Sequence, residues 1–309
     1  MLKRWRIGLI LMIAMAASIL ISACGGTTTG TGTATPATQP SGLGTPGTYN
    51  CISGSITTAG STALAPLVQA VAKVYQGKCQ GANITVNLGG SGSGLSQVEA
   101  GNIQIGNSDI FKKTGQDDLV DHQVAVVVFS LIINSKVTGV TGLTTDQIKG
   151  IYSGKITNWK DVGGPDLKIV VVSRPSSSGT RATFQQYILG GPESISGPSN
   201  LTSDSTSTVV TNVKQTDGAI GYAASGAAKA SGLTLLSLDG SAPTSDLVKT
   251  NSYKFWNIEH MYTKGPASGL TQAFIDYMSS SDAKQQAATL DYIATTDMTP
   301  AAVQAHQPA

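Results

Sequence analysis

The residues most suited to chemistry in this chain lie in a run of nine at 173–181, which reads Ser-Arg-Pro-Ser-Ser-Ser-Gly-Thr-Arg. An apolar run typical of a strand precedes it at 167–172, and a run typical of a helix follows at 182–189. We therefore expect a fixed cation and several hydroxyl groups at the start of a helix. Backbone N–H groups at that position lack intrahelical partners, and the N-terminal end of the helix dipole carries a partial positive charge. Donors of these kinds suit a small tetrahedral anion.

Three other turns, at 60–63, 90–94 and 106–109, are polar in the same way, and each directly follows a predicted strand. In an open α/β sheet such turns lie together at the carboxyl ends of the strands, where ligands bind. With 173–181 they supply hydroxyl groups, backbone amides, the guanidinium of Arg174 and the carboxylate of Asp109. Each turn alone is equally typical of a helix cap or a flexible loop, so the predicted anion site depends on their combination.

The predicted elements that would position these turns alternate between strand and helix, which indicates an α/β fold with a mainly parallel sheet and helices on both faces. About 259 residues follow residue 50, which is enough for two cores. Strands are predicted at 52–58, 83–88, 103–106, 123–134, 168–172 and 218–222, and helices from 63 to about 75 and at 95–100, 144–151, 182–189, 268–279 and 282–293.

The long apolar strand at 123–134 is suited to cross between two lobes. We predict a first lobe made of 51–130 together with 252–309, and a second lobe made of 131–251. Because small ligands commonly bind at the interface between lobes, the polar turns are expected to face a central cleft.

The start of the chain has the features of an export signal at 1–23, with three basic residues followed by an apolar stretch too short to span a bilayer comfortably. The sequence Ile-Ser-Ala-Cys that ends at Cys24 resembles the lipobox of bacterial lipoproteins. That resemblance implies cleavage before Cys24 and its acylation, which would anchor the chain to the outer face of the cytoplasmic membrane. An ordinary signal peptide is the alternative. The uncharged Gly, Thr and Pro-rich segment that continues to residue 50 is predicted to be a flexible tether.

Charge and cysteine content exclude several kinds of partner. Without the predicted signal, the chain has 17 basic and 18 acidic residues (20 minus three, against 18) and no basic run, which argues against nucleic acid. Cys51 and Cys79 are suspected to form a disulfide, since thiols outside the cytoplasm usually pair, although their spacing cannot prove it. The three histidines, His122, His260 and His306, are too scattered for a metal site. We expect no metal and no cofactor.

Taken together, the motifs resemble those of the phosphate-binding lipoproteins and periplasmic proteins that serve phosphate ABC importers. The resemblance covers 52–295 and depends on the runs at 59–66, 90–94, 106–109, 148–159, 173–181 and 218–222. It implies a two-lobed fold of the periplasmic-binding-protein type (type II), with a central cleft and crossing hinge strands. It also implies a monomeric binding protein, and not an enzyme. Such a protein captures inorganic phosphate and delivers it to the permease subunits of an ABC importer.

Carried over position by position, the resemblance implies that four turns bind phosphate. Arg174 would clamp two oxygens, and Asp109 would accept the proton that phosphate, unlike sulfate, still carries near neutral pH. Many relatives have an aspartate two residues after this arginine, whereas this chain has Ser176, so what orients Arg174 stays open. The other implied ligands are Ser61, Thr62, Ala63, Ser91, Ser178, Gly179 and Thr180.

There are four rival interpretations. The run 281–284 matches the S-x-x-K motif of penicillin-interacting enzymes, but no S-D-N motif accompanies it. The glycines at 90–94 resemble a dinucleotide-binding motif, but Leu95 occupies the position of its third glycine. A binding protein for another oxyanion, such as sulfate, molybdate or tungstate, would share the fold. A non-transport role, such as phosphate sensing or surface adhesion, also stays open.

Overall fold

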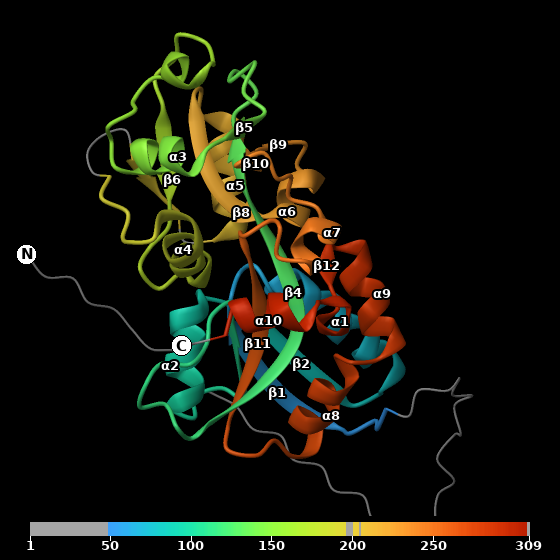
Figure 1. Ribbon diagram of the computed structural model, residues 1–309. Coiled ribbons are helices and arrows are strands. Elements are labelled where there is room, and N and C mark those ends of the chain that lie inside the picture. The colour runs from blue at the N-terminus through green and yellow to red at the C-terminus, as the bar shows by residue number, and fades with distance from the viewer. Residues whose placement is uncertain (1–48, 196–199, 204, 308–309) are drawn as a thin grey trace, which may run out of the picture. The chain divides into compact units, whose positions relative to one another are not determined.

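The computed structural model describes residues 49–195, 200–203 and 205–307, which Figure 1 colours from blue to red. The predicted export signal, Cys24 and the tether up to residue 48 lie outside the described residues. Ten strands of the described part form one mixed sheet in the order β2-β1-β3-β11-β4-β8-β6-β7, with β12 and β9 also paired to β4. The strands are β1 (Gly54–Gly60), β2 (Ala82–Leu88), β3 (Ile105–Ser108), β4 (Leu119–Ile133), β6 (Val170–Ser173), β7 (Asn200–Thr202), β8 (Ala219–Ala224), β9 (Thr234–Leu235), β11 (Trp256–Lys264) and β12 (Tyr292–Ile293). A separate pair consists of β5 (Gly142–Leu143) and β10 (Ser237–Leu238).

The long strand β4 belongs to both halves of this sheet, and its partner changes along its length (Figure 1). Its residues from Leu119 to Val128 pair with β11, and those from Phe129 to Ile133 pair with β8. We call the part built on β1, β2, β3, β11 and β12 the first lobe, and the part built on β6, β7 and β8 the second lobe. The predicted two-lobed α/β fold is therefore confirmed. Neighbouring strands are parallel within β2-β1-β3 and β8-β6-β7, whereas the strands that cross between the lobes pair antiparallel.

Helices cover both faces of the first-lobe sheet because its strands alternate their side chains. Ile56 of β1 packs in one apolar cluster with Leu67 and Val68 of α1, whereas Ala59 packs in another with Leu95 of α2. The helices are α1 (Ala65–Lys78), α2 (Ser91–Glu99), α3 (Thr145–Tyr152), α4 (Gly179–Phe184), α5 (Thr206–Gln215), α6 (Ser225–Ala230), α7 (Ser245–Lys249), α8 (Gly269–Tyr277), α9 (Ser281–Thr289) and α10 (Pro300–Ala305). Short 3-10 turns lie at Trp159–Val162 and Thr295–Asp297, and a π-helical turn continues α4 over Gln185–Leu189. None of the helices in the described ranges has both the length and the apolar content to cross a membrane.

One predicted loop is a helix in the structure. Most of the glycine and serine run at 90–94 was expected to be a turn, but α2 begins at Ser91. Local propensity disfavours a helix there, since glycine is among the poorest helix formers. Tertiary contacts outweigh that propensity: the N–H of Gly90 donates to the carbonyl of Gly60, and the N–H of Gly92 donates to the carbonyl of Ser177 in the other lobe. The first turn of α2 is thus part of the contact between the lobes.

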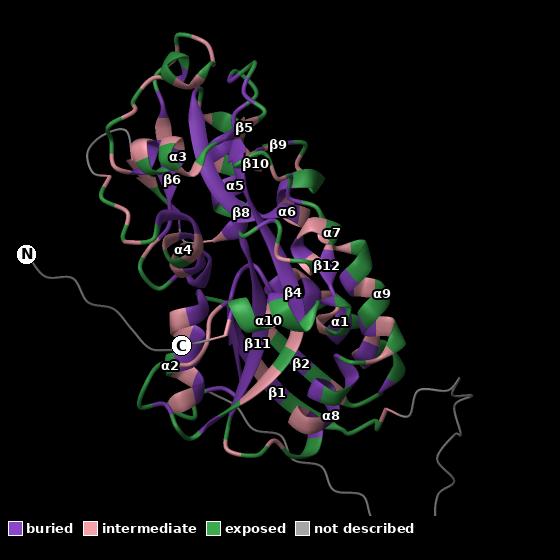
Figure 2. Cartoon of the chain, in the orientation of Figure 1, coloured by how far each residue is buried: buried purple, intermediate pink, exposed green. Residues whose placement is uncertain are grey.

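The strands at the junction of the lobes are the most deeply buried part of the fold (Figure 2). Every residue of β8 is buried, and in β11 every residue before Lys264 is buried. Most of these side chains are apolar, as expected for strands covered on both faces. The buried residues Asn257, Glu259, His260 and Thr263 are exceptions. Buried polar side chains in such a strand require partners, and two of these four, Asn257 and Glu259, lie beside the candidate site described below.

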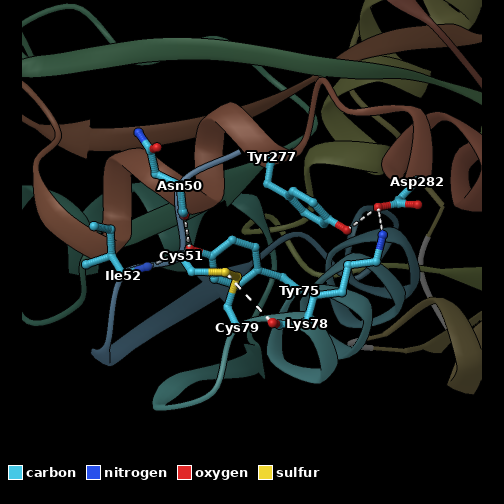
Figure 3. Close-up of a disulfide and its surroundings, with 8 residues drawn as sticks. All are labelled: Asn50, Cys51, Ile52, Tyr75, Lys78, Cys79, Tyr277 and Asp282. Carbon is cyan, nitrogen blue, oxygen red and sulfur yellow. Dashed lines mark hydrogen bonds and ion pairs between the residues drawn. A yellow bond between two sulfur atoms is a disulfide. The ribbon is translucent and has the colours of Figure 1, made fainter. Parts of the chain in front are cut away.

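A disulfide joins Cys51, just before β1, to Cys79, just after α1 (Figure 3). The hydroxyl of the buried Tyr75 lies beside it; this group donates to the carbonyl of Asn50 (2.7 Å) and accepts from the N–H of Ile52 (3.3 Å). The segment before β1 is therefore held to the end of α1 both covalently and by hydrogen bonds.

Replacing both Cys51 and Cys79 with serine is expected to lower the free energy of unfolding by about 3–4 kcal/mol, because the bridge closes a loop with a sequence separation of 28 residues. For a domain of this size the midpoint of thermal unfolding should fall by about 10 °C. A reducing agent should lower the melting temperature of the wild type by a similar amount and leave that of the double variant unchanged. Equal melting temperatures for the oxidised wild type and the double variant would contradict this prediction.

The imidazole of His306, which follows α10, is buried between two aromatic rings. Its centroid lies 3.6 Å from that of Trp256 and 3.9 Å from that of Tyr187. Burial, helped by the nearby charge of Lys254, lowers the pKa of His306 to about 3. In an unfolded chain the pKa of histidine is about 6.5, so between these values the unfolded chain binds a proton that the folded protein does not.

Stability is therefore expected to fall as the pH decreases from about 6.5 towards about 3. His306→Phe preserves the stacking and removes the titration. Between neutral pH and about pH 5, the melting temperature of the wild type should therefore fall more than that of the variant. A difference that does not depend on pH would show that His306 does not contribute to acid sensitivity.

Candidate anion-binding site

The four predicted turns meet between the two lobes, at the carboxyl ends of their strands. Ser61 and Thr62 lie between β1 and α1, Ser91 begins α2, Asp109 follows β3, and the segment from Arg174 to Thr180 connects β6 to α4. All nine residues implied by the resemblance are buried, including the guanidinium of Arg174, whose residue is 1% exposed. A buried cation and a buried carboxylate are costly unless they are paired or hydrogen-bonded, so their partners define the site.

Asp109 connects its own turn to the other three. Its Oδ1 accepts a hydrogen bond from the hydroxyl of Ser61, and its Oδ2 accepts one from the hydroxyl of Thr180 (2.8 Å). Its own backbone N–H donates to Oγ of Ser91 (3.0 Å). Ser61 of the first lobe and Thr180 of α4 in the second lobe therefore contact one carboxylate, and Ser91 contacts the backbone of the same residue.

Arg174 shares the hydroxyl group of Thr180 with Asp109. Its guanidinium donates to Oγ1 of Thr62 (2.8 Å), of Thr180 (3.3 Å) and of Thr206 (3.3 Å). The hydroxyl of Thr180 thus accepts from Arg174 and donates to Asp109. A fixed cation and a hydrogen-bond acceptor are one hydroxyl group apart, which allows a small anion that carries a proton to contact both.

The backbone that carries Arg174 is held by a second arginine. Nη1 of Arg181 donates to the carbonyl of Arg174 (2.6 Å), and Nε of Arg181 lies 3.5 Å from the carboxylate of Glu193. The side chain of Glu193 is 1% exposed and also accepts from the hydroxyl groups of Tyr222 (2.5 Å) and Ser173. Ser176, two residues after Arg174, is exposed. Sequence reasoning missed Glu193 because nothing in its local sequence marks it.

Two of the predicted donors are engaged in local hydrogen bonds. Oγ of Ser178 accepts from the N–H of Arg181 (3.3 Å) and so caps α4. The N–H of Ala63 donates to Oγ of Ser61 (3.1 Å). A cap of this kind leaves the hydroxyl hydrogen of Ser178 available for another acceptor, whereas the hydroxyl group of Ser61 donates to Asp109. The roles of Ser178 and Ala63 as ligands stay predictions.

Three residues near the site were missed by sequence reasoning. Thr206 begins α5, and its Oγ1 lies 3.1 Å from that of Thr62. Nδ2 of Asn257 donates to the carbonyl of Asp109 (2.7 Å) and to Oγ1 of Thr183 (3.2 Å), so it joins the first lobe to α4. The third is Glu259. The only available signal for Asn257 and Glu259 was a polar residue within an apolar strand, which does not identify its neighbours.

Glu259 gives the site a second carboxyl group. Burial, followed by the charge of Asp109 and a hydrogen bond with the carboxyl group of Asp109, raises the pKa of Glu259 well above its usual value. The raised pKa favours the neutral form of Glu259 more than in a solvent-exposed carboxyl group.

A cavity of about 590 Å³ lies next to the site, between α6 of the second lobe and the end of α9 in the first lobe. Ala63, Thr206 and Tyr292 line its inner part, and Lys229 and Asp291 also line it. Nζ of Lys229 lies 2.7 Å from the carboxylate of Asp291, so an ion pair connects the lobes here. Within the described residues, no group of three or more His, Cys, Asp or Glu side chains has the arrangement of a metal site.

Comparison with known proteins places this chain in a family. The family model of the PBP superfamily domain matches residues 29–282. The phosphate-binding protein PstS of Bacillus subtilis (strain 168) is 44% identical over 295 residues, which cover 94% of this chain and 95% of that protein. The PstS of Borreliella burgdorferi is 28% identical and covers 75% of this chain and 88% of its own length.

Solved structures agree with these sequence matches. A phosphate ABC transporter substrate-binding protein from Clostridium perfringens, with bound phosphate, is 31% identical with a TM-score of 0.74, and the match covers 78% of this chain and 100% of that one. An ABC-type phosphate transport receptor from Vibrio cholerae is 29% identical with a TM-score of 0.63 and the same coverage. On the family match and the 44% identity, this chain belongs to the PBP superfamily and, within it, to the PstS family of phosphate-binding proteins.

Proposed function

We propose that this chain captures inorganic phosphate outside the cytoplasm and delivers it to the permease of an ABC importer. The observation that carries the proposal is the contact of the Thr180 hydroxyl with both Arg174 and Asp109. It holds a fixed cation and a hydrogen-bond acceptor in one buried cluster between the lobes. The names of the relatives, which are phosphate-binding and phosphate-transport proteins, support the same ligand.

In the proposed complex, Arg174 binds two phosphate oxygens and Asp109 accepts a hydrogen bond from a protonated oxygen of the ligand. Thr62 and Ser91 donate through their hydroxyl groups, and Ser61 lies beside them with its own hydroxyl group on Asp109. Ala63, Ser178, Gly179 and Thr180 complete the set from the starts of α1 and α4. Charge-assisted hydrogen bonds of this kind are about twice as strong as neutral ones. Sulfate has no proton to offer near neutral pH, so it would present an unprotonated oxygen to the carboxylate of Asp109 and be rejected.

Binding is proposed to close the two lobes around the ion. The ligands come from both lobes, and the carbonyl of Ser177 already accepts from the N–H of Gly92 (2.9 Å) across the cleft. For the lobe boundaries we propose 51–130 with 252–309 and 131–251. The change in the pairing partner of β4 between Val128 and Phe129, close to the first of these boundaries, supports this division.

The proposal extends to the location of the protein. The lipobox-like sequence before Cys24 supports cleavage at that residue and a lipid anchor, with the segment up to residue 50 as a tether. The protein would act as a monomer on the outer face of the cytoplasmic membrane, and as a binding protein rather than an enzyme. Radiolabelled palmitate should be incorporated into the wild-type protein when it is expressed in a bacterium and should be absent from Cys24→Ser.

Isothermal titration calorimetry of the lobes without the leader, stripped of bound anion, tests the function directly. We expect tight, saturable binding of phosphate and binding of sulfate that is weaker by about a thousandfold. Phosphate should also raise the melting temperature, since a ligand that binds only the folded state stabilises it. Equal affinity for both anions, or none for phosphate, would overturn the proposal. Turnover of a chromogenic phosphate ester would instead indicate an enzyme.

Gly179 offers a test of the packing that brings the turns together. A Cβ atom at this position would lie 2.2 Å from Oγ of Ser91 and 2.9 Å from Cβ of Asp109. Gly179→Ala is therefore expected to push α4 away from the first lobe and to weaken phosphate binding by about tenfold or more. Gly191→Ala is the matched control, because a Cβ there would meet no atom within 4 Å. Similar affinities for the two variants in calorimetry would contradict this account.

A further inference from the structure

The side chain of Glu259 lies beside Asp109 because of the register between β11 and β3. These strands are antiparallel, with His260 opposite Ser108 and Met261 opposite Asn107. Continuing this register by one residue places Glu259 opposite Asp109, and directly opposed residues point to the same face of a sheet. The hydrogen bond from Asn257, two residues earlier on β11, to the carbonyl of Asp109 agrees with this placement.

The surroundings of the two carboxyl groups differ. Glu259 is 0% exposed, and no N–H or O–H group of the described residues donates to either of its oxygens. Asp109 is 2% exposed, and its oxygens accept from the hydroxyl groups of Ser61 and Thr180. Hydrogen bonds to a carboxylate stabilise the ionised form, whereas burial without donors disfavours it. A proton shared by the pair therefore resides on Glu259, and the carboxylate is that of Asp109.

The other ionisable groups near Glu259 do not alter this assignment. Tyr292 of β12 faces the pair, but its hydroxyl donates to the carbonyl of Ala63 and burial raises its pKa well above the usual value, so it stays neutral. His260 stacks on Tyr262 on the other face of the sheet, with Nδ1 2.8 Å from Asp121. Arg174 contacts Asp109 through Thr180 and so favours the carboxylate at Asp109 rather than at Glu259.

We propose that Glu259 is protonated and donates a hydrogen bond to Asp109. This hydrogen bond keeps Asp109 the hydrogen-bond acceptor by which the site distinguishes phosphate from sulfate. The inference rests on the proposed function as a phosphate-binding protein. If both groups were ionised, two negative charges would face the incoming anion. If Asp109 were protonated, it would donate equally well to sulfate. The proton on Glu259 prevents both states, so Glu259 is a positioning residue that does not itself contact the ligand.

Infrared difference spectroscopy tests the protonation without any ligand. Near neutral pH, the spectrum of the wild type minus that of Glu259→Gln should contain the C=O stretching band of a protonated carboxylic acid, which shifts in heavy water. Glu99→Gln is the control, because Glu99 is only partly buried and accepts a hydrogen bond from Gln116. Its difference spectrum should lack that band. Absence of the band for Glu259→Gln would overturn the proposal.

Calorimetry with phosphate and sulfate tests the effect on specificity through a pair of variants. The amide of Glu259→Gln still donates to Asp109, so this variant should keep most of the phosphate-over-sulfate preference. Glu259→Met has a similar volume and no donor, and should narrow the preference by about tenfold or more. Equal preferences in the two variants would overturn the proposal and leave Glu259 with a structural role only. If the wild type does not bind phosphate, the proposed function fails, while the infrared result still decides the location of the proton.

Discussion

Arg174→Ala is expected to weaken phosphate binding by about a hundredfold or more. The guanidinium is buried and would make two charge-assisted hydrogen bonds to the ion, each worth about 1.5–3 kcal/mol. The sum corresponds to a factor of about a hundred to ten thousand in the dissociation constant. The loss should appear in calorimetry as a higher dissociation constant, with a binding enthalpy that is less favourable.

Two further variants show whether phosphate binding depends on the charge of Arg174 or on the geometry of its guanidinium group. Arg174→Lys keeps the positive charge but cannot present two parallel donors, so its affinity should lie between those of the wild type and Arg174→Ala. Lys168→Ala removes an exposed cation of the same lobe, just before β6, and should bind like the wild type. Wild-type affinity in Arg174→Ala, with an unchanged melting temperature, would show that Arg174 is not the clamp. The model of the site would then be wrong.

Asp109→Asn is expected to remove most of the preference for phosphate over sulfate. A carboxylate gains a charge-assisted hydrogen bond from protonated phosphate, whereas it faces an unprotonated oxygen of sulfate without a donor. A difference of about 4 kcal/mol between these situations corresponds to a preference of about a thousandfold. The amide of asparagine can donate to sulfate, so sulfate binding should strengthen while phosphate binding weakens.

Titrations of both anions at the same neutral pH measure this ratio. Asp146→Asn, which changes an exposed aspartate on α3, is the matched control and should leave the ratio unchanged. If the ratio in Asp109→Asn equals that of the wild type, Asp109 does not determine the selectivity. A result in which only Asp109→Asn and Glu259→Met narrow the preference would support a selectivity that depends on the pair of carboxyl groups.

Local sequence was sufficient to predict the kind of site and the turns that form it. Strand-like runs that end in glycine, serine or threonine can be recognised from a few neighbouring residues. Parallel strands bring their carboxyl ends together even when they are far apart in the chain. The turns at 60–63 and 106–109 and the segment from Arg174 to Thr180 were identified in this way. The start of α2 at Ser91 was not, because contacts such as that of Gly92 with the other lobe outweigh the low helix propensity of glycine.

The partners of the charged groups were decided only by the tertiary structure. Thr180 contacts Asp109 across 71 positions of sequence, and Thr206 contacts Thr62 across 144. Glu259 lies beside Asp109 only because β11 returns to the first lobe antiparallel to β3 in one particular register. A shift of that register by one residue would turn Glu259 to the other face of the sheet. The sequence therefore determined which turns could bind an anion, whereas strand pairing over long separations decided which side chains share a proton, because residue type alone does not specify a neighbour.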